Sequence, residues 1–135
     1  YCETEFEGCA NCPADCGPCQ QRGIVTSCKN PLHYALTFDD GPSWATSGLL
    51  DTLDAEGVLA TFFVVGYRVE KPEFRPFVQR AFGDGHFIAT HSYSHPHLTW
   101  LSDAQIRSEM ENTEAAVRGS ICLRPRIFRP PFGET

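Results

Sequence analysis

The stretch HYALTFDDGP, residues 33–42, decides how the rest of the chain is organised. Its apolar residues fall on every second position up to Phe38, a period that predicts a β-strand over 33–39. The strand then meets Asp39, Asp40 and a Gly-Pro pair, and Gly and Pro favour a turn. Two adjacent carboxylates are therefore expected at the carboxyl end of a strand.

Beyond this strand, apolar runs and helical patterns alternate. The sequence predicts helices over 43–56, 72–82 and 102–119, and further strands over 60–65, 87–90 and 126–128. Ser102, with Gln105 three residues later, has the pattern of a capping box at the start of the last helix. The alternation of strands and helices indicates a parallel sheet or an α/β barrel, in which active groups lie at the carboxyl ends of the strands.

The first 28 residues follow another pattern. They lack a regular apolar period and hold six of the seven cysteines: Cys2, Cys9, Cys12, Cys16, Cys19 and Cys28. Two Cys-x-x-Cys pairs, 9–12 and 16–19, resemble the knuckles of a zinc ribbon, but only three residues separate them. Because two knuckles need ~15 to 20 residues between them, we favour disulfides, whose pairing stays open.

We accordingly divide the chain into a Cys-rich segment, 1–30, and an α/β part, 31–135. If the six early cysteines pair with one another, Cys122 has a free thiol or a partner beyond this sequence. The sequence opens on Tyr1, without Met and without a basic and apolar leader, and the cysteines suit an oxidising compartment. We expect a processed protein that is secreted or held in the cell wall.

Length, charge and apolar content exclude several classes of protein. The 135 residues suit one domain, and 41% hydrophobic with 21% charged residues is an ordinary globular composition. A net charge of −6 repels a phosphate backbone, so nucleic acid is not an expected partner. The longest apolar stretch, 59–66, is far shorter than the ~20 residues that cross a bilayer, so no membrane span is expected.

Histidines gather just after the third predicted strand. His91 and His95 are four residues apart, so one helical turn or a tight loop would direct both imidazoles at one ion. Taken singly, the Asp pair is typical of a turn and the His pair of a polar loop. Together with Arg129 after the last predicted strand, they favour a metal-assisted active site.

Three ordered stretches carry a family resemblance: TFDDGP at 37–42, HSYSH at 91–95 and RPPFG at 129–133. They resemble the first three motifs of the polysaccharide deacetylases built on the NodB homology domain, carbohydrate esterase family 4. The stretch TFFV at 61–64 is similar to that family's second strand. The resemblance implies that this α/β chain is the N-terminal part of a distorted (β/α) barrel, preceded by a short disulfide-rich segment.

The resemblance also implies a metal site and a base. Asp40, His91 and His95 would hold a divalent metal, zinc or alternatively cobalt, a donor set that leaves open positions for water and substrate. Asp39 would be the general base that takes a proton from the attacking water, and Arg129 would keep Asp39 ionised and oriented.

Two further features follow from the third motif. A backbone N–H near Phe132 would help to stabilise the oxyanion, in a loop shaped by Pro130 and Pro131. The family continues past this motif with an Asp, a Trp and a general-acid His, and none of the five histidines here matches that His. We therefore expect a C-terminal remainder of the same protein as a partner and expect the isolated 1–135 chain to be incomplete.

The sequence thus predicts a metal-dependent enzyme that removes N-acetyl groups from chitin or chitooligosaccharides and releases acetate. The amino-acid sequences of segments 50–54 and 94–98 are more similar to fungal chitin deacetylases than to bacterial peptidoglycan enzymes. Two alternatives stay open: a deacetylase of acetylxylan or peptidoglycan, and a non-catalytic carbohydrate-binding or structural relic of the same fold.

Overall fold

The computed structural model describes Cys28 and residues 32–134. The chain divides into two compact units, Tyr1–Tyr34 and Ala35–Thr135, and the fold reported below is that of the second. The predicted disulfide framework falls almost wholly on cysteines outside the described residues: Cys2, Cys9, Cys12, Cys16 and Cys19.

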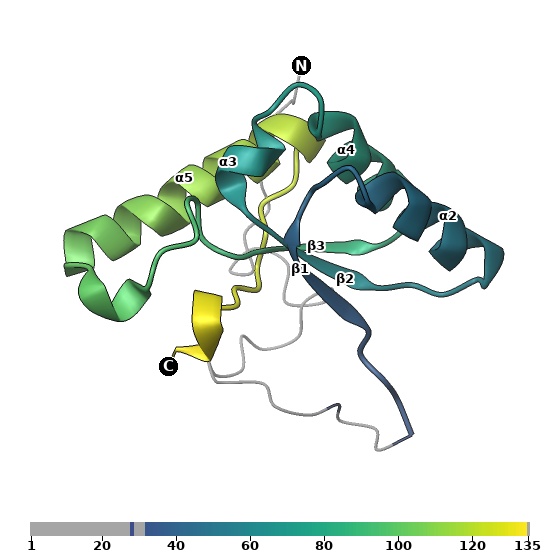
Figure 1. Ribbon diagram of the computed structural model, residues 1–135, viewed down its shortest axis with the longest axis horizontal. Helices are drawn as coiled ribbons and strands as arrows, with labels where there is room; N and C mark the ends of the chain where they lie inside the picture. Colours follow the sequence, from purple (N-terminus) through teal and green to yellow (C-terminus); the bar gives the residue numbers. More distant parts are fainter. Residues whose placement is uncertain (1–27, 29–31, 135) are drawn as a thin grey trace, which may run out of the picture. The chain divides into compact units, whose positions relative to one another are not determined.

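Three parallel strands in the order β1-β2-β3 form the sheet (Figure 1). In chain order the elements are β1 (Thr37–Gly41), α2 (Thr46–Ala55), β2 (Thr61–Val64), α3 (Gly66–Val69), α4 (Arg75–Gly83), β3 (Phe87–Thr90) and α5 (Asp103–Ile121), with 3-10 turns at Leu98–Trp100 and Pro131–Gly133. Because the strands are parallel, their carboxyl ends meet at one edge of the sheet. The Asp pair and the His cluster therefore leave the sheet at the same edge.

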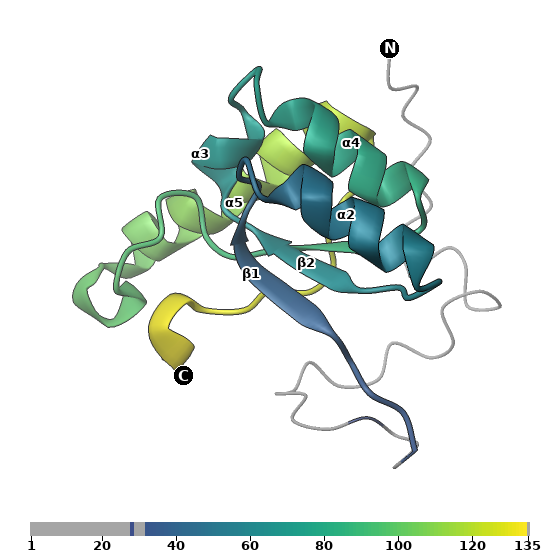
Figure 2. The same cartoon turned by 45° about the vertical axis from the view of Figure 1, so that its right-hand side comes forward.

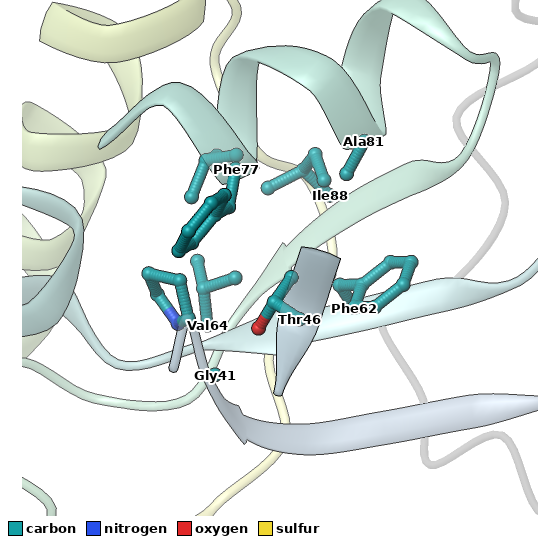
Figure 3. Close-up of a pocket in the computed structure, with 9 residues that line it drawn as sticks. Gly41, Thr46, Phe62, Val64, Phe77, Ala81 and Ile88 are labelled. Carbon is teal, nitrogen blue, oxygen red and sulfur yellow. The ribbon is translucent and has the colours of Figure 1, made fainter. Parts of the chain in front are cut away.

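Helices α2 and α4 lie on the same side of the sheet (Figure 2). The core lies between them and the strands and extends to α3 and α5. Its buried members include Leu50 of α2, Phe62 of β2, Val78 of α4, Ile88 of β3 and Val117 of α5. A cavity of about 10 Å³ between α2, α4 and the sheet, lined mainly by apolar side chains, has room for one water at most (Figure 3). It is a packing gap and not a substrate site.

Three of the four predicted strands form, and they run parallel as expected, but not every boundary agrees. β3 covers the predicted 87–90, whereas β1 begins at Thr37 and runs through both aspartates to Gly41. The last predicted strand, 126–128, is present only as one parallel bridge between Thr90 and Phe128. Two hydrogen bonds, each 3.0 Å, join Thr90 to Ile127 and Arg129 there. This segment thus lies against β3 as a fourth strand would, without forming a full ladder.

The helix predictions succeed where the termini carry local signals. The side-chain oxygen of Gln105 accepts a hydrogen bond from the Ser102 N–H at 2.9 Å, so α5 begins with the expected capping box. Helix α2 ends at Ala55, and Gly57, with φ of 63°, follows its C-cap. The N–H groups of Gly57 and Val58 bond back to the carbonyl oxygens of Asp54 and Leu53. The short α3 was not expected, because four residues carry no usable period.

The two described cysteines differ from the expectation. Cys28 has a free thiol, so the six early cysteines do not all pair with one another. Cys122, which ends α5 in a left-handed conformation, is disulfide-bonded and is not a free thiol. No disulfide joins two of the residues that the structure describes. Within the same residues, no helix has the length and apolar content needed to cross a membrane.

The contact between α3 and α5 depends on Gly66. A methyl group at this position would lie 2.6 Å from Cδ2 of Tyr93 and 3.0 Å from Cα of Thr113. Thr113 is fully buried in α5, and Tyr93 lies in the loop between the two histidines. The absence of a side chain therefore lets the start of α3 approach both α5 and the His loop.

We predict that Gly66→Ala lowers the free energy of unfolding by ~1–3 kcal/mol, because the added methyl overpacks a tight contact. Gly48→Ala is the matched control, since nothing lies within 4 Å of a methyl group there and Gly48 is helical. That change should be neutral or stabilising by up to ~1 kcal/mol. Urea unfolding of both variants makes the comparison, and equal stability of the two would contradict the packing.

Candidate metal centre

A bulge at the end of β1 shapes the Asp pair. Asp39 pairs with Phe63 of β2, but Gly41 pairs with the next residue, Val64, so Asp40 is an extra residue in β1. Asp40 adopts a φ of 66°, a left-handed conformation that Asp tolerates better than most residues. In a regular strand, neighbouring side chains point to opposite faces, whereas a bulge redirects one of them. Both carboxylates consequently come within 4.0 Å of the same imidazole, that of His91.

His91 follows β3 directly and is buried. Its Nδ1 lies 2.7 Å from the backbone oxygen of Arg129. Because a carbonyl oxygen only accepts, Nδ1 must donate, which leaves the lone pair of Nε2 free. That Nε2 is 3.4 Å from Oδ1 of Asp40. The tautomer required of a metal ligand is therefore set by the backbone at Arg129.

His95 completes a group of three ligand atoms. Its Nε2 lies 3.1 Å from the same Oδ1 of Asp40, and the three atoms all lie within 4.8 Å of one another. Ligands at ~2.1 Å around a tetrahedral ion are ~3.4 Å apart, close to the two separations seen here. Two imidazole nitrogens and one carboxylate oxygen suit a divalent ion such as zinc or cobalt. Asp40, His91 and His95 can therefore hold a divalent metal.

Arg129 contacts both Asp39, through its side chain, and His91, through its backbone oxygen. Its Nη1 donates to Oδ1 of Asp39 at 2.6 Å and to Oγ1 of Thr37 at 3.1 Å. The guanidinium lies 3.9 Å from the centre of the Phe63 ring, a cation–π contact that limits its movement. Since both charged groups are about one-third exposed, this pair orients Asp39 more than it stabilises the fold.

The loop with the third motif lies against His95. The Phe132 ring is 4.8 Å from that of His95 in an edge-on contact, and it is half exposed. Pro131 is fully buried and begins the 3-10 turn, while Phe132 has a φ of 58°. The structure thus places Phe132, which follows the buried Pro131, beside the ligand group.

Left-handed backbone is concentrated around the site. Five described residues other than glycine have a positive φ, and four of them belong to the ligand group or border it: Asp40, Ser92, His95 and Phe132. Such conformations cost free energy and persist where the surrounding contacts impose them, typically at functional sites. The sequence shows no signal for them, because none of the four is a glycine.

His97 does not join the ligand group. Its Nδ1 forms a 2.7 Å hydrogen bond with Glu134, and its ring stacks between those of Trp100, at 4.2 Å, and Phe132, at 3.8 Å. The hydrogen bond from His97 lowers the pKa of Glu134, and two hydrogen bonds from Thr99 act in the same direction. His97 is therefore held beside the site by an acid and two aromatic rings.

Sequence reasoning missed the acids that hold the His loop. Glu70 accepts a 2.7 Å hydrogen bond from the Tyr93 hydroxyl, which raises the pKa of Tyr93 and keeps the phenol protonated. Glu109 of α5 accepts from the backbone of Tyr93 and Ser94. Glu109 does not stand out in the sequence, because it is one of several exposed or half-exposed acids along α5.

The chain belongs to the polysaccharide deacetylase family, whose sequence pattern matches residues 26–135. It is 35% identical over 136 aligned residues to chitin deacetylase 1 of Cryptococcus neoformans var. grubii, covering 98% of this chain and 28% of that protein. It is 40% identical to a peptidoglycan-N-acetylglucosamine deacetylase of Bacillus cereus over 78% of this chain and 38% of that protein. The chain thus spans well under half of the length of either relative.

Solved structures of the family share the fold. The Xyl-CE4 domain of a xylanase from the hindgut metagenome of Trinervitermes trinervoides superposes with a TM-score of 0.72 at 44% identity, over 75% of this chain and 49% of that one. A family 4 acetyl xylan esterase of Clostridium thermocellum, solved with a cobalt ion, gives a TM-score of 0.71 at 40% identity, over 75% and 49% respectively. The described residues therefore form part of a deacetylase domain of carbohydrate esterase family 4.

We predict that replacing Asp40, His91 or His95 by Ala weakens binding of Zn²⁺ or Co²⁺ by at least ~100-fold, because each removes one of three ligands. His97→Ala is the control and should bind metal as the unchanged protein does, since His97 contacts Glu134 and lies outside the ligand group. Competition with a coloured chelator measures the affinities. Equal loss in His97→Ala would mean that the ligand set is wrong.

Proposed function

We propose that the protein is a metal-dependent polysaccharide deacetylase that hydrolyses N-acetyl groups of chitin or chitooligosaccharides and releases acetate. One arrangement carries the proposal: Asp40, His91 and His95 converge on one point, while Arg129 holds Asp39 beside them. Membership in the polysaccharide deacetylase family supports it.

Asp39 is the proposed general base. Arg129 occupies its Oδ1, at 2.6 Å, whereas its Oδ2 faces Nε2 of His91 at 4.0 Å. The oxygen nearer the ligand group is thus the one left to take a proton from the attacking water. When bound, a divalent ion supplies the charge that polarises the acetyl carbonyl and acidifies the water.

The reaction balances with the groups at hand and one further acid. Water oxygen bonds to the acetyl carbon, its proton passes to Asp39, and the C–N bond breaks to give acetate and an amine. A backbone N–H near Phe132 is the proposed donor to the oxyanion. The departing amine needs a proton from an acid. His97 is not our candidate, because its Nδ1 is hydrogen-bonded to Glu134. We propose that a C-terminal remainder of the protein supplies that acid.

The choice of chitin as the substrate rests on the chitin deacetylases among the relatives and on the sequences of segments 50–54 and 94–98. A second fungal relative, a chitin deacetylase of Pestalotiopsis, is 41% identical over 83% of this chain and 38% of that protein. Peptidoglycan and acetylxylan are the alternative substrates, since a peptidoglycan-N-acetylglucosamine deacetylase of Bacillus cereus and an acetyl xylan esterase of Clostridium thermocellum each share 40% identity with this chain. We further propose zinc as the metal, completion of the strands to a distorted (β/α) barrel, and secretion or a place in the cell wall.

A substrate panel tests the proposal with the full-length protein. Acetate release is measured from chitooligosaccharides, N-acetylated peptidoglycan and acetylxylan, each with Zn²⁺ and with Co²⁺. Release at the highest kcat/KM from chitooligosaccharides is expected. A preference for another polymer would move the protein to that substrate, and no release from any of them would favour the non-catalytic relic.

We predict that Asp39→Asn lowers kcat by ~10²–10⁴-fold and leaves metal affinity nearly unchanged, because a base contributes about that factor and Asp39 is not a ligand. His91→Ala should lose metal and activity together. Acetate release and metal affinity, measured on the same preparations, separate the two roles. Equal loss of metal in both variants would contradict the assignment of Asp39.

A further inference from the structure

The segment between the two histidine ligands, Ser92–Ser94, is fixed on both sides of its backbone. Its carbonyl groups face α3, where the N–H groups of Gly66 and Tyr67 donate to the oxygens of Ser92 and Tyr93 at 3.0 Å each. Its amide groups face α5, which runs alongside this loop (Figure 1). A single acid of α5, Glu109, meets them.

Glu109 accepts three hydrogen bonds from this loop. Its Oε2 accepts from the backbone N–H of Tyr93 at 2.7 Å and from that of Ser94 at 2.8 Å. Its Oε1 accepts from the Ser94 hydroxyl at 2.8 Å. Hydrogen bonds to a charged acceptor are short and roughly twice as strong as neutral ones. Two successive loop amides thus obtain their partner from one carboxylate.

Glu109 is itself held in place by neighbouring residues of α5. Glu109 is half-buried, and its backbone oxygen accepts a 2.7 Å hydrogen bond from the Thr113 hydroxyl. Thr113 is the fully buried residue against which Gly66 packs. The same region of α5 therefore supports α3, which binds the loop carbonyls, and carries Glu109, which binds the loop amides.

The loop geometry decides where His95 lies. His95 follows Ser94 directly, has a φ of 61°, and its N–H donates to Oγ of Ser92 at 3.1 Å. A change in the backbone at Tyr93 and Ser94 would therefore move His95 relative to His91, which is fixed separately by Arg129. Displacements beyond ~0.5 Å are enough to impair a metal or catalytic site.

We propose that Glu109 is a positioning residue for the metal centre: by accepting the amides of Tyr93 and Ser94, it holds Nε2 of His95 against Oδ1 of Asp40. This inference deepens the proposed function, because it concerns the same site. Glu109 acts through the loop and touches no reacting atom. Its role does not depend on which polymer is the substrate.

Metal affinity tests the proposal without relying on activity. Glu109→Ala in the full-length protein should weaken Co²⁺ and Zn²⁺ binding by ~10–100-fold, the usual effect of losing a partner that orients ligands. The Co²⁺ absorption spectrum should change in shape as His95 is displaced. Glu111→Ala, an exposed acid on the same helix, is the control and should leave both readouts unchanged.

Two further variants distinguish positioning from charge and from folding. Glu109→Gln keeps an oxygen for the two amides, and the Ser94 hydroxyl can turn to accept from the new amide group, so affinity should recover to within a few-fold. Ser94→Ala removes one hydrogen bond of the three and should give a smaller loss than Glu109→Ala. The double variant should be no worse than Glu109→Ala alone, because both act on one contact.

Several outcomes would overturn the proposal. These are unchanged metal affinity and Co²⁺ spectrum in Glu109→Ala, an equal effect of Glu111→Ala, or a Glu109→Gln variant as defective as Glu109→Ala. If Glu109→Ala does not fold, the Gln and Ser94 variants still decide. A protein that binds metal as expected but releases no acetate would refute the proposed function and leave this inference standing.

Discussion

The hydrogen bond from Nδ1 of His91 to the backbone oxygen of Arg129 is the contact on which the site depends. It sets the tautomer of the imidazole and aims Nε2 at Asp40. Arg129 also donates its backbone N–H to the carbonyl oxygen of Thr90 at the end of β3, and its side chain binds Asp39. One residue thus joins the end of β3 to the carboxylates of β1.

The bulge at Asp40 gives two adjacent carboxylates different surroundings. Asp39 pairs in register with β2 and turns one oxygen to Arg129, whereas Asp40 stands outside the register and meets His91 and His95. Like charges this close are unfavourable unless each has its own partner. An arginine on one side and a metal on the other would satisfy that requirement, and the bulge separates the two environments.

Local signals in the sequence anticipated much of this fold. The capping box at Ser102 marks the start of α5, and the apolar run at 87–90 gives β3, because a cap or a strand period lies in a few neighbouring residues. Two elements differ from the prediction: α3, whose four residues carry no such period, was not expected, and the predicted strand 126–128 is reduced to one bridge. The states of the two described cysteines also differed from expectation, Cys28 being a free thiol and Cys122 disulfide-bonded, since cysteine spacing does not determine connectivity.

By itself, the sequence determined which residues are proposed to carry the chemistry: the motifs at 37–42, 91–95 and 129–133 single out Asp39, Asp40, His91, His95 and Arg129. Only the tertiary structure decided how they meet, through the bulge at Asp40, the backbone oxygen of Arg129 and, as proposed, the carboxylate of Glu109. These contacts join residues distant in the sequence or depend on main-chain conformation. A pattern of side chains along the chain shows neither, because both are set only when the strands, helices and loops pack together.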